Sequence, residues 1–189
     1  MLLDLKLIER RFMMIIYKNT NLLLSPAQTL VNPVNTKGVM GAGIAKEFKY
    51  YYPKMYQKYV QICRRNDFHP GELQLFKGEQ GANYIRKRWV LNFPTKKHWR
   101  DPSKITYLES GLAKFAATYK ARGITSVAFP PLGAGCGGLN TKQVLALMEQ
   151  YLDQLDLPVY IHQFRPIRGQ QGKQHDEIVK NLATDSSLK

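Results

Sequence analysis

Cysteine is rare in this 189-residue chain: Cys63 and Cys136 are the only two, and they form no spacing motif. A disulfide framework is therefore not predicted, and a reducing cytoplasm is the expected location. The four histidines lack metal-ligand spacing, so we expect no metal site. No apolar run approaches the roughly 20 residues that cross a bilayer, and residues 1–12 lack a signal-peptide cleavage site. We expect no membrane partner.

Acidic residues are also scarce, since 14 Asp and Glu stand against 28 Lys and Arg, a net charge of +14. This excess favours a polyanionic partner, although solubility is the simpler alternative. The charge is concentrated in residues 86–104, where one acid, Asp101, faces seven cations interleaved with Trp89, His98 and Trp99. Cations beside stacking rings suit a nucleic acid, while a solvated sheet edge is the competing interpretation. The seven cations are Arg86, Lys87, Arg88, Lys96, Lys97, Arg100 and Lys104.

Strand-like runs alternate with helical runs along most of the chain. This alternation predicts a single α/β domain whose central sheet is mixed but mostly parallel, with helices on both faces. Strands are expected near residues 14–17, 29–34, 73–76, 89–93, 126–130 and 159–164, with a hairpin-like turn at 78–83. We assign residues 1–12 to an N-terminal extension, 13–165 to the domain, and 166–189 to a polar tail or linker, with a short helix possible at 176–182.

Helical spacing of apolar residues predicts the helices. Two are expected at residues 41–51 and 54–65, and a third is expected to open at Asp101-Pro102, a cap followed by a first-turn proline. The third helix places Ile105, Leu108, Leu112, Phe115 and Tyr119 on one stripe and ends near Gly123. Asn140 or Thr141 is expected to cap the fourth.

Two glycine-rich segments, Gly38–Gly43 and Gly133–Gly138, each join a predicted strand to a predicted helix. Glycine allows close approach of a ligand to the backbone, and a helix N-terminus offers free N–H groups to a phosphate. Neither segment contains GK[ST] or the full G-x-G-x-x-G spacing. At the carboxyl ends of strands they would face each other across a crevice, which predicts a diphosphate-binding site.

Asn32–Ala45 together with Pro130–Leu139 resembles the macrodomain family of ADP-ribose-binding modules, and the resemblance covers roughly residues 14–164. The segments VNPVNTKGVMGAGIAKEFK and NFPTKKHWR further resemble the DarG subgroup, antitoxins that remove ADP-ribose from thymidine in DNA modified by a DarT-type toxin. The resemblance implies a DNA ADP-ribosyl glycohydrolase that acts on ADP-ribosylated single-stranded DNA. ADP-ribose is then ligand and product, with no separate cofactor, and we expect a monomer.

Matching the motifs position by position implies the site residues. Lys96, after Thr95, corresponds to the catalytic lysine of the subgroup, and the next four residues, Lys97, His98, Trp99 and Arg100, are expected to contact DNA. A related eukaryotic glycohydrolase has an aspartate near Gly137, so an aspartate-assisted mechanism is not expected here. The implied ADP-ribose-binding residues are Asn21, Asn32, Asn35, Gly38, Val39, Met40, Gly41, Ala42, Gly43, Ile44, Pro131, Leu132, Gly133, Ala134, Gly135, Cys136, Gly137 and Gly138.

An amine can assist cleavage of an N-glycosidic bond in two ways. Protonated Lys96 could donate to the departing base or to the ring oxygen, whereas neutral Lys96 could attack the anomeric carbon. The sequence leaves both routes open. It also leaves three rival functions open: a non-catalytic ADP-ribose reader, a hydrolase of ADP-ribosyl-carboxylates or of ADP-ribose 1″-phosphate, and a plain nucleic-acid-binding domain.

Overall fold

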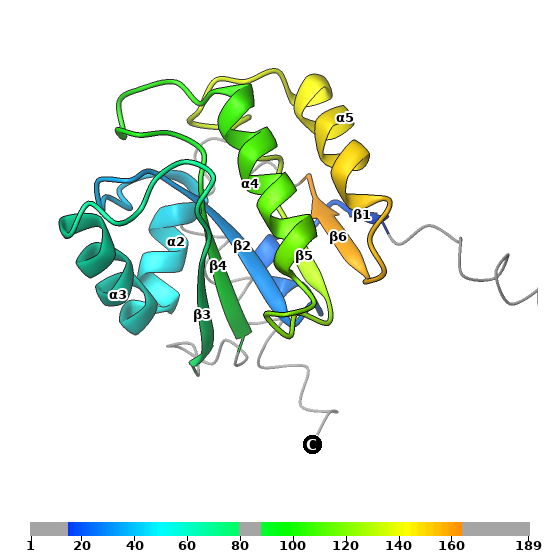
Figure 1. Cartoon of the computed structure of the whole chain (residues 1–189), viewed down its shortest axis with the longest axis horizontal. Helices are drawn as coiled ribbons and strands as arrows, with labels where there is room; N and C mark the ends of the chain where they lie inside the picture. Colours follow the sequence, from blue (N-terminus) through cyan, green and yellow to red (C-terminus); the bar gives the residue numbers. More distant parts are fainter. Residues whose placement is uncertain (1–14, 80–87, 164–189) are drawn as a thin grey trace, which may run out of the picture.

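The structure, a computed structural model, describes residues 15–79 and 88–163. In them a six-stranded sheet lies between two pairs of helices, α2 with α3 and α4 with α5 (Figure 1). The strands are β1 (Ile15–Lys18), β2 (Thr29–Val34), β3 (Gln74–Glu79), β4 (Arg88–Pro94), β5 (Val127–Phe129) and β6 (Val159–His162). The helices are the short 3-10 turn η1 (Leu22–Leu24), α2 (Gly43–Tyr51), α3 (Pro53–Arg64), α4 (Ile105–Thr118) and α5 (Thr141–Leu152).

The strand order is β1-β6-β5-β2-β4-β3, and only the β3–β4 pair is antiparallel. This confirms the predicted mixed, mostly parallel sheet. Because the five parallel strands run the same way, the loops after β2, β4, β5 and β6 emerge at one edge of the sheet. The two glycine segments follow β2 and β5, so the topology brings both of them to this edge.

Side-chain alternation along the strands builds a separate core on each face of the sheet. Val31 and Phe93 pack under α4 and α5, whereas Leu30 and Val90 pack under α2 and α3. The predicted stripe on α4 is buried at Leu108, Leu112 and Phe115. Within α4, a Cβ at Gly111 would collide with the ring of Phe93, so this helix lies unusually close to β4.

The expected start of α4 at Asp101-Pro102 is wrong. The helix begins at Ile105, and its N-cap residue, Lys104, makes no side-chain capping bond. Residues 101–104 are held by other partners, because the Asp101 N–H donates to the His98 carbonyl (3.1 Å) and the Ser103 N–H to the Gly137 carbonyl (2.9 Å). The hydrogen bond between Ser103 and the second glycine segment thus takes the place of the expected cap at Asp101.

The other caps follow the sequence. Asn140 caps α5 and accepts a hydrogen bond from the Gln143 N–H (3.1 Å). Gly123 lies in the turn after α4, where the Ile124 N–H donates to the Tyr119 carbonyl, the bond pattern of a glycine C-cap. The remaining elements lie within about three residues of the predicted bounds. Residues 1–12, most of the 78–83 turn and everything from 164 onward, including the 176–182 helix, lie outside the described residues, so the extension and tail remain predictions.

Candidate active site

A cavity of about 1390 Å³ opens at the carboxyl edge of the sheet. Its wall is made by the segment after β1, the first glycine segment with α2, the segment after β4, the second glycine segment, and the end of β6. Residues that line it are Thr20–Leu22, Pro33–Asn35, Val39, Gly41–Glu47, Tyr50, Tyr51, Thr95, Lys96, Trp99, Pro130, Pro131, Gly133–Gly137, Thr141, His162 and Gln163. The two glycine segments therefore face a common space, as their position after neighbouring strands predicted.

Asn35 shapes the first glycine segment from within. Its Oδ1 accepts from the Lys37 N–H (2.9 Å), and its Nδ2 donates to the Val39 carbonyl (2.6 Å). The buried Tyr59 hydroxyl donates to the Asn35 carbonyl (2.8 Å), and burial raises the pKa of Tyr59. The Asn35 amide is therefore engaged with its own loop, although the residue lies on the cavity wall.

The N-terminus of α2 points its unpaired backbone at the cavity. Ala42 is the N-cap residue and makes no side-chain cap, and the first turn contains no acidic residue. The first N–H groups of a helix have no partner within the helix, and they carry partial positive charge. Gly43, Ile44 and Ala45, which bear these groups, all line the cavity. This end of the wall is suited to an anionic ligand.

Two glycines of the second segment are required by packing against Ser103. A Cβ at Gly133, which has φ of +68°, would lie 2.9 Å from the Ser103 Cβ. A Cβ at Gly137 would collide with the Ser103 Oγ and with the Gly133 carbonyl oxygen. An aspartate at position 137 is therefore incompatible with this loop conformation. In contrast, a Cβ at Gly135 would meet nothing within 4 Å.

Lys96 joins the two glycine segments. The Thr95 N–H donates to the Val34 carbonyl (2.9 Å), and the Thr36 N–H donates to the Lys97 carbonyl (3.0 Å), so residues 95–97 continue the pairing of β4 with β2. From this anchored position Lys96 extends to the second segment, where its Nζ donates to the Cys136 carbonyl (2.8 Å). Lys96 is only 8% exposed. A buried ammonium or amine at the cavity wall is an unusual feature that invites a chemical role.

His98, Trp99 and Arg100 form a stack beside the cavity. The rings of His98 and Trp99 lie 3.7 Å apart, and the Arg100 guanidinium lies 5.7 Å from the Trp99 ring centre. Trp99 is 45% exposed and lines the cavity, whereas Lys97, His98 and Arg100 do not line it. The stack offers an aromatic face with an adjoining cation at the rim.

Five residues of the implied ADP-ribose set do not reach the cavity wall: Asn32, Gly38, Met40, Leu132 and Gly138. Asn32 is fully buried and belongs to a chain of amides, in which its Nδ2 donates to Asn92 Oδ1 (2.9 Å) and Asn92 Nδ2 donates to Gln74 Oε1 (2.9 Å). Met40 and Leu132 are core residues. The other thirteen members of the set, Asn21 among them, line the cavity.

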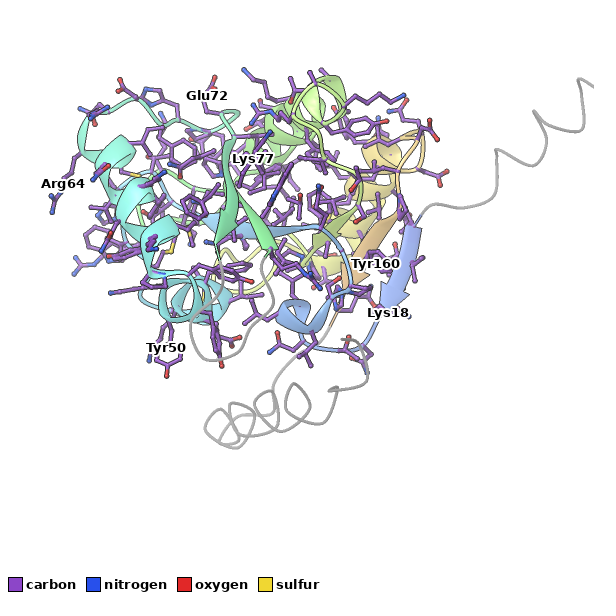
Figure 2. All side chains as sticks on the ribbon, turned by 90° about the horizontal axis from the view of Figure 1, so that it is seen from below. Lys18, Tyr50, Arg64, Glu72, Lys77 and Tyr160 are labelled. Atoms are coloured by element: carbon purple, nitrogen blue, oxygen red, sulfur yellow. The ribbon has the colours of Figure 1, made fainter. Side chains whose placement is uncertain are left out.

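One face of α2 supplies wall residues that sequence reasoning missed. Glu47, Tyr50 and Tyr51 line the cavity together with Gly43 and Ile44. Their spacing of one, four, seven and eight residues from Gly43 is that of a helical face, so the signal was available in the sequence. Tyr50 projects outward beside α2 (Figure 2).

Glu47 is the single carboxylate among the described residues of the wall. Asn21 holds it, since its Nδ2 donates to Glu47 Oε2 (3.4 Å) while its Oδ1 caps η1 through the Leu23 N–H (2.9 Å). Burial, with added repulsion from Glu47 and Tyr50, raises the pKa of Tyr51 to about 12. A paired-carboxylate glycosidase mechanism needs two acids across the scissile bond, and this wall does not provide them.

His162 closes the far end of the wall and was also missed. It is 3% exposed, and its Nδ1 lies 3.0 Å from the Thr20 carbonyl, which identifies the Nδ1–H tautomer. Burial lowers the pKa of His162, Lys18 lowers it further, and the Thr20 bond opposes the shift. Among the described residues no group of His, Cys, Asp and Glu is arranged to hold a metal ion, and no helix has the length and apolarity to span a membrane.

Acidification should destabilise the protein through His162. Because the pKa of His162 is lower in the folded state, the unfolded chain binds the proton more readily, and stability is lost as the pH falls below about 6.5. We expect the thermal midpoint to decrease between pH 7 and pH 5, and the decrease to be smaller in His162→Asn. Thermal unfolding of both proteins across this range provides the measurement. Equal slopes for the two would contradict the assignment.

Comparison with known proteins identifies relatives of this site. The family model for the Macro domain matches residues 31–148. The chain is 43% identical over 136 residues to a DNA ADP-ribosyl glycohydrolase of Thermus aquaticus, covering 72% of this chain and 37% of that protein. Among solved structures, the macrodomain of Thermus aquaticus DarG superposes with a TM-score of 0.72 at 39% identity, covering 79% of this chain and 97% of that chain.

A second solved structure is Thermosipho africanus DarTG in complex with ADP-ribose. It superposes with a TM-score of 0.73 at 36% identity and covers 82% of this chain and 44% of that chain. The chain thus spans less than half the length of these longer relatives, and it corresponds to nearly the whole of the isolated Thermus macrodomain.

Proposed function

The chain belongs to the macrodomain family, and on that premise we propose that it is a DNA ADP-ribosyl glycohydrolase. Its substrate is single-stranded DNA that carries ADP-ribose on a thymidine base, and its products are ADP-ribose and the restored base. The names of the relatives that match most of this chain support the assignment. The observation that carries it is Lys96, buried at the cavity wall and held 2.8 Å from the Cys136 carbonyl between the two glycine segments.

The glycine segments bind the diphosphate in this proposal. The free N–H groups at the start of α2 face the cavity, and the backbone of Gly133–Gly137 forms the opposite wall. The cavity volume of about 1390 Å³ exceeds the 300–1,000 Å³ typical of small-molecule pockets. It accommodates an extended dinucleotide-like ligand with the modified base at its mouth.

Hydrolysis breaks the bond between the anomeric carbon and the base nitrogen, and water supplies the new hydroxyl group. The transition state resembles an oxocarbenium ion, so the departing base needs a proton. With Glu47 as the single carboxylate of the described wall, Lys96 is the group best placed to act. As an ammonium it gives its proton to the base nitrogen and regains one from the attacking water. As a free amine it instead attacks the anomeric carbon and displaces the base, which takes up the proton that the new C–N adduct loses. Water then cleaves this adduct, which restores the amine and leaves the hydroxyl group on the sugar.

The rim stack selects DNA. A flipped or unpaired base can stack on Trp99, while Arg100 and Lys97 lie outside the wall where the phosphates of the same strand would pass. We infer that the protein reverses the modification made by a DarT-type toxin in the cytoplasm and that it acts as a monomer. No cofactor other than water enters the reaction.

Incubation with an oligonucleotide ADP-ribosylated on thymidine tests the function. We expect release of free ADP-ribose, monitored by chromatography, and recovery of the unmodified strand, monitored by electrophoresis. ADP-ribosyl-glutamate peptides and ADP-ribose 1″-phosphate serve as competing substrates and should turn over more slowly. Tight ADP-ribose binding without release from any of the three would instead identify a reader, and the enzymatic proposal would be abandoned.

A further inference from the structure

A second hollow lies along the edge strand of the sheet, on β3. It has a volume of about 750 Å³ and is lined by Lys54, Lys58, Gln74–Gly78 and Arg122, and we call it the β3 groove. No residue of the β3 groove lines the candidate active site. β3 is the outermost strand of the sheet, next to β4, with α3 packed against one of its faces (Figure 1).

Cations flank this strand from both sides of the sheet. Lys54 and Lys58 lie one turn apart on α3, and the Lys58 ammonium lies 5.1 Å from the ring centre of Phe76. On the other side lies Lys77, labelled in Figure 2, whose ammonium is 4.7 Å from the ring centre of Trp89, a residue that packs against the α4–α5 core. These cation–ring contacts hold both ammonium groups along the surface of the groove.

Arg122 is fixed in the groove by hydrogen bonds. Its Nη1 donates to the Leu73 carbonyl (3.1 Å) and its Nε to the Thr118 hydroxyl (3.0 Å). The guanidinium is therefore positioned before any partner arrives, which reduces the entropy that binding must overcome.

Among the side chains that the structure describes, the cations of the groove have no acidic partner. Neither the groove lining nor the whole of α3, Pro53–Arg64, contains a carboxylate. Elsewhere on the described surface, cations do pair with acids, as Lys114 does with Glu72 (3.5 Å) and Lys120 with Asp156 (3.8 Å). Four cations concentrated around one strand edge, with no carboxylate partner among the described side chains, favour an extended polyanion.

The groove and the cavity are lined by neighbouring residues of α2 and α3. Lys46 and Tyr50 of α2 line the cavity, and α3, which starts after the single residue Tyr52, places Lys54 in the groove four residues beyond Tyr50. The chain therefore passes from the cavity wall to the groove within four residues. Among the described strands β3 pairs with β4 alone, so the N–H groups along its other edge are further donors for phosphate oxygens.

From this arrangement we propose that the β3 groove binds the phosphate backbone of single-stranded nucleic acid. It would hold the part of the substrate strand that extends beyond the modified nucleotide. The inference rests on the proposed function for its choice of strand, but it concerns surface residues outside the catalytic cavity. Its consequence is that long strands bind more tightly than short ones, whereas the chemistry at the cavity is unchanged.

A charge-matched pair of variants tests the proposal in the full chain. Lys58→Gln/Lys77→Gln removes two cations from the groove, and Lys114→Gln/Lys120→Gln removes two from outside it. Fluorescence anisotropy with an unmodified single strand of about 20 nucleotides reports affinity across salt concentrations. In a plot of the logarithm of the binding constant against the logarithm of the salt concentration, each phosphate contact contributes about 0.7 to the slope. The groove variant, which lacks two contacts, should therefore have a slope smaller by about 1.4. Between about 50 and 200 mM salt its affinity should fall about sevenfold less than that of the parent.

The control variant should keep nearly the parental slope. Equal losses in the two variants would overturn the proposal, as would a groove variant that binds DNA normally but loses affinity for polyglutamate. Release of ADP-ribose from a modified trinucleotide should be the same in all three proteins. If the parent releases none, the proposed function fails, while the difference in DNA affinity between the variants still decides the groove.

Discussion

Lys96→Ala should reduce release of ADP-ribose from modified DNA by at least about 100-fold, since a positioned proton donor typically contributes 10²–10⁴ to a rate. Lys96 lies at the cavity wall and its Nζ reaches the Cys136 carbonyl, so its loss removes the amine while the glycine segments keep their own hydrogen bonds. Single-turnover assays with excess enzyme provide the rate, and calorimetry provides the affinity for ADP-ribose. The rate should fall far more than the affinity.

Lys97→Ala is the matched control for this experiment. Lys97 is the adjacent lysine, but it is exposed and does not line the cavity, so its removal should weaken DNA binding modestly without slowing the bond-breaking step. Lys96→Arg keeps the positive charge but is a poor proton donor and a poor nucleophile, and it should not restore turnover. Parental single-turnover rates in Lys96→Ala would refute the catalytic assignment.

The acid route and the nucleophilic route of Lys96 differ in their intermediates. If neutral Lys96 attacks the anomeric carbon, opening of the sugar generates an imine that cyanoborohydride reduces to a stable adduct. Mass spectrometry of the trapped protein would then locate ADP-ribose on Lys96. If Lys96 acts as an acid, the base leaves with the Lys96 proton and no adduct accumulates.

Gly137→Ala should disrupt the second glycine segment and with it ADP-ribose binding. The added Cβ would collide with the Ser103 Oγ and the Gly133 carbonyl oxygen, and the Ser103 N–H anchors this same loop through the Gly137 carbonyl. Overpacking of this kind costs about 1–3 kcal/mol in the free energy of unfolding. Chemical denaturation and calorimetry should show lower stability together with a loss of affinity of at least about tenfold, which corresponds to 1.4 kcal/mol.

Gly135→Ala is the internal control, because its Cβ would have no neighbour within 4 Å and its φ lies outside the left-handed region. It should leave the free energy of unfolding unchanged. Gly137→Asp should lower stability and ADP-ribose affinity at least as much as Gly137→Ala does. This result would show that the loop differs in conformation from one that carries an aspartate at this position. Wild-type stability and affinity in Gly137→Ala would show that the loop can move away from Ser103 at little cost.

Much of the site could be predicted from motifs. Both glycine segments, Lys96 and Trp99 were identified as site residues, and the structure places them around one cavity. Local patterns worked because strand order and connection rules bring the loops after parallel strands to one edge. The face of α2 that adds Glu47 and Tyr50 to the wall follows from helical periodicity, once the helix is known to begin at the cavity.

Partnerships between distant segments could not be predicted. Asn32 and Asn35 look alike in the sequence, yet Asn32 pairs with Asn92 inside the sheet while Asn35 shapes the loop at the wall. Asp101-Pro102 has the features of a helix start, but the helix begins at Ile105, because Ser103 is bound to the second glycine segment. Such outcomes depend on contacts with no local signature.

By itself the sequence determined the α/β class, the family, the two glycine segments and the excess of positive charge. Hydrophobic periodicity and glycine positions can be read from short stretches of sequence, and the net charge is a sum over residues, so none of these depends on contacts between distant segments. Only the tertiary structure decided how the glycine segments are used. It brought Lys96 of a third segment between them, placed Ser103 against Gly133 and Gly137, and distributed the cations into a rim stack and a separate β3 groove. The physical reason is that burial, unpaired charge and steric exclusion are properties of residues far apart in the chain, and they exist only once the sheet has aligned the loops.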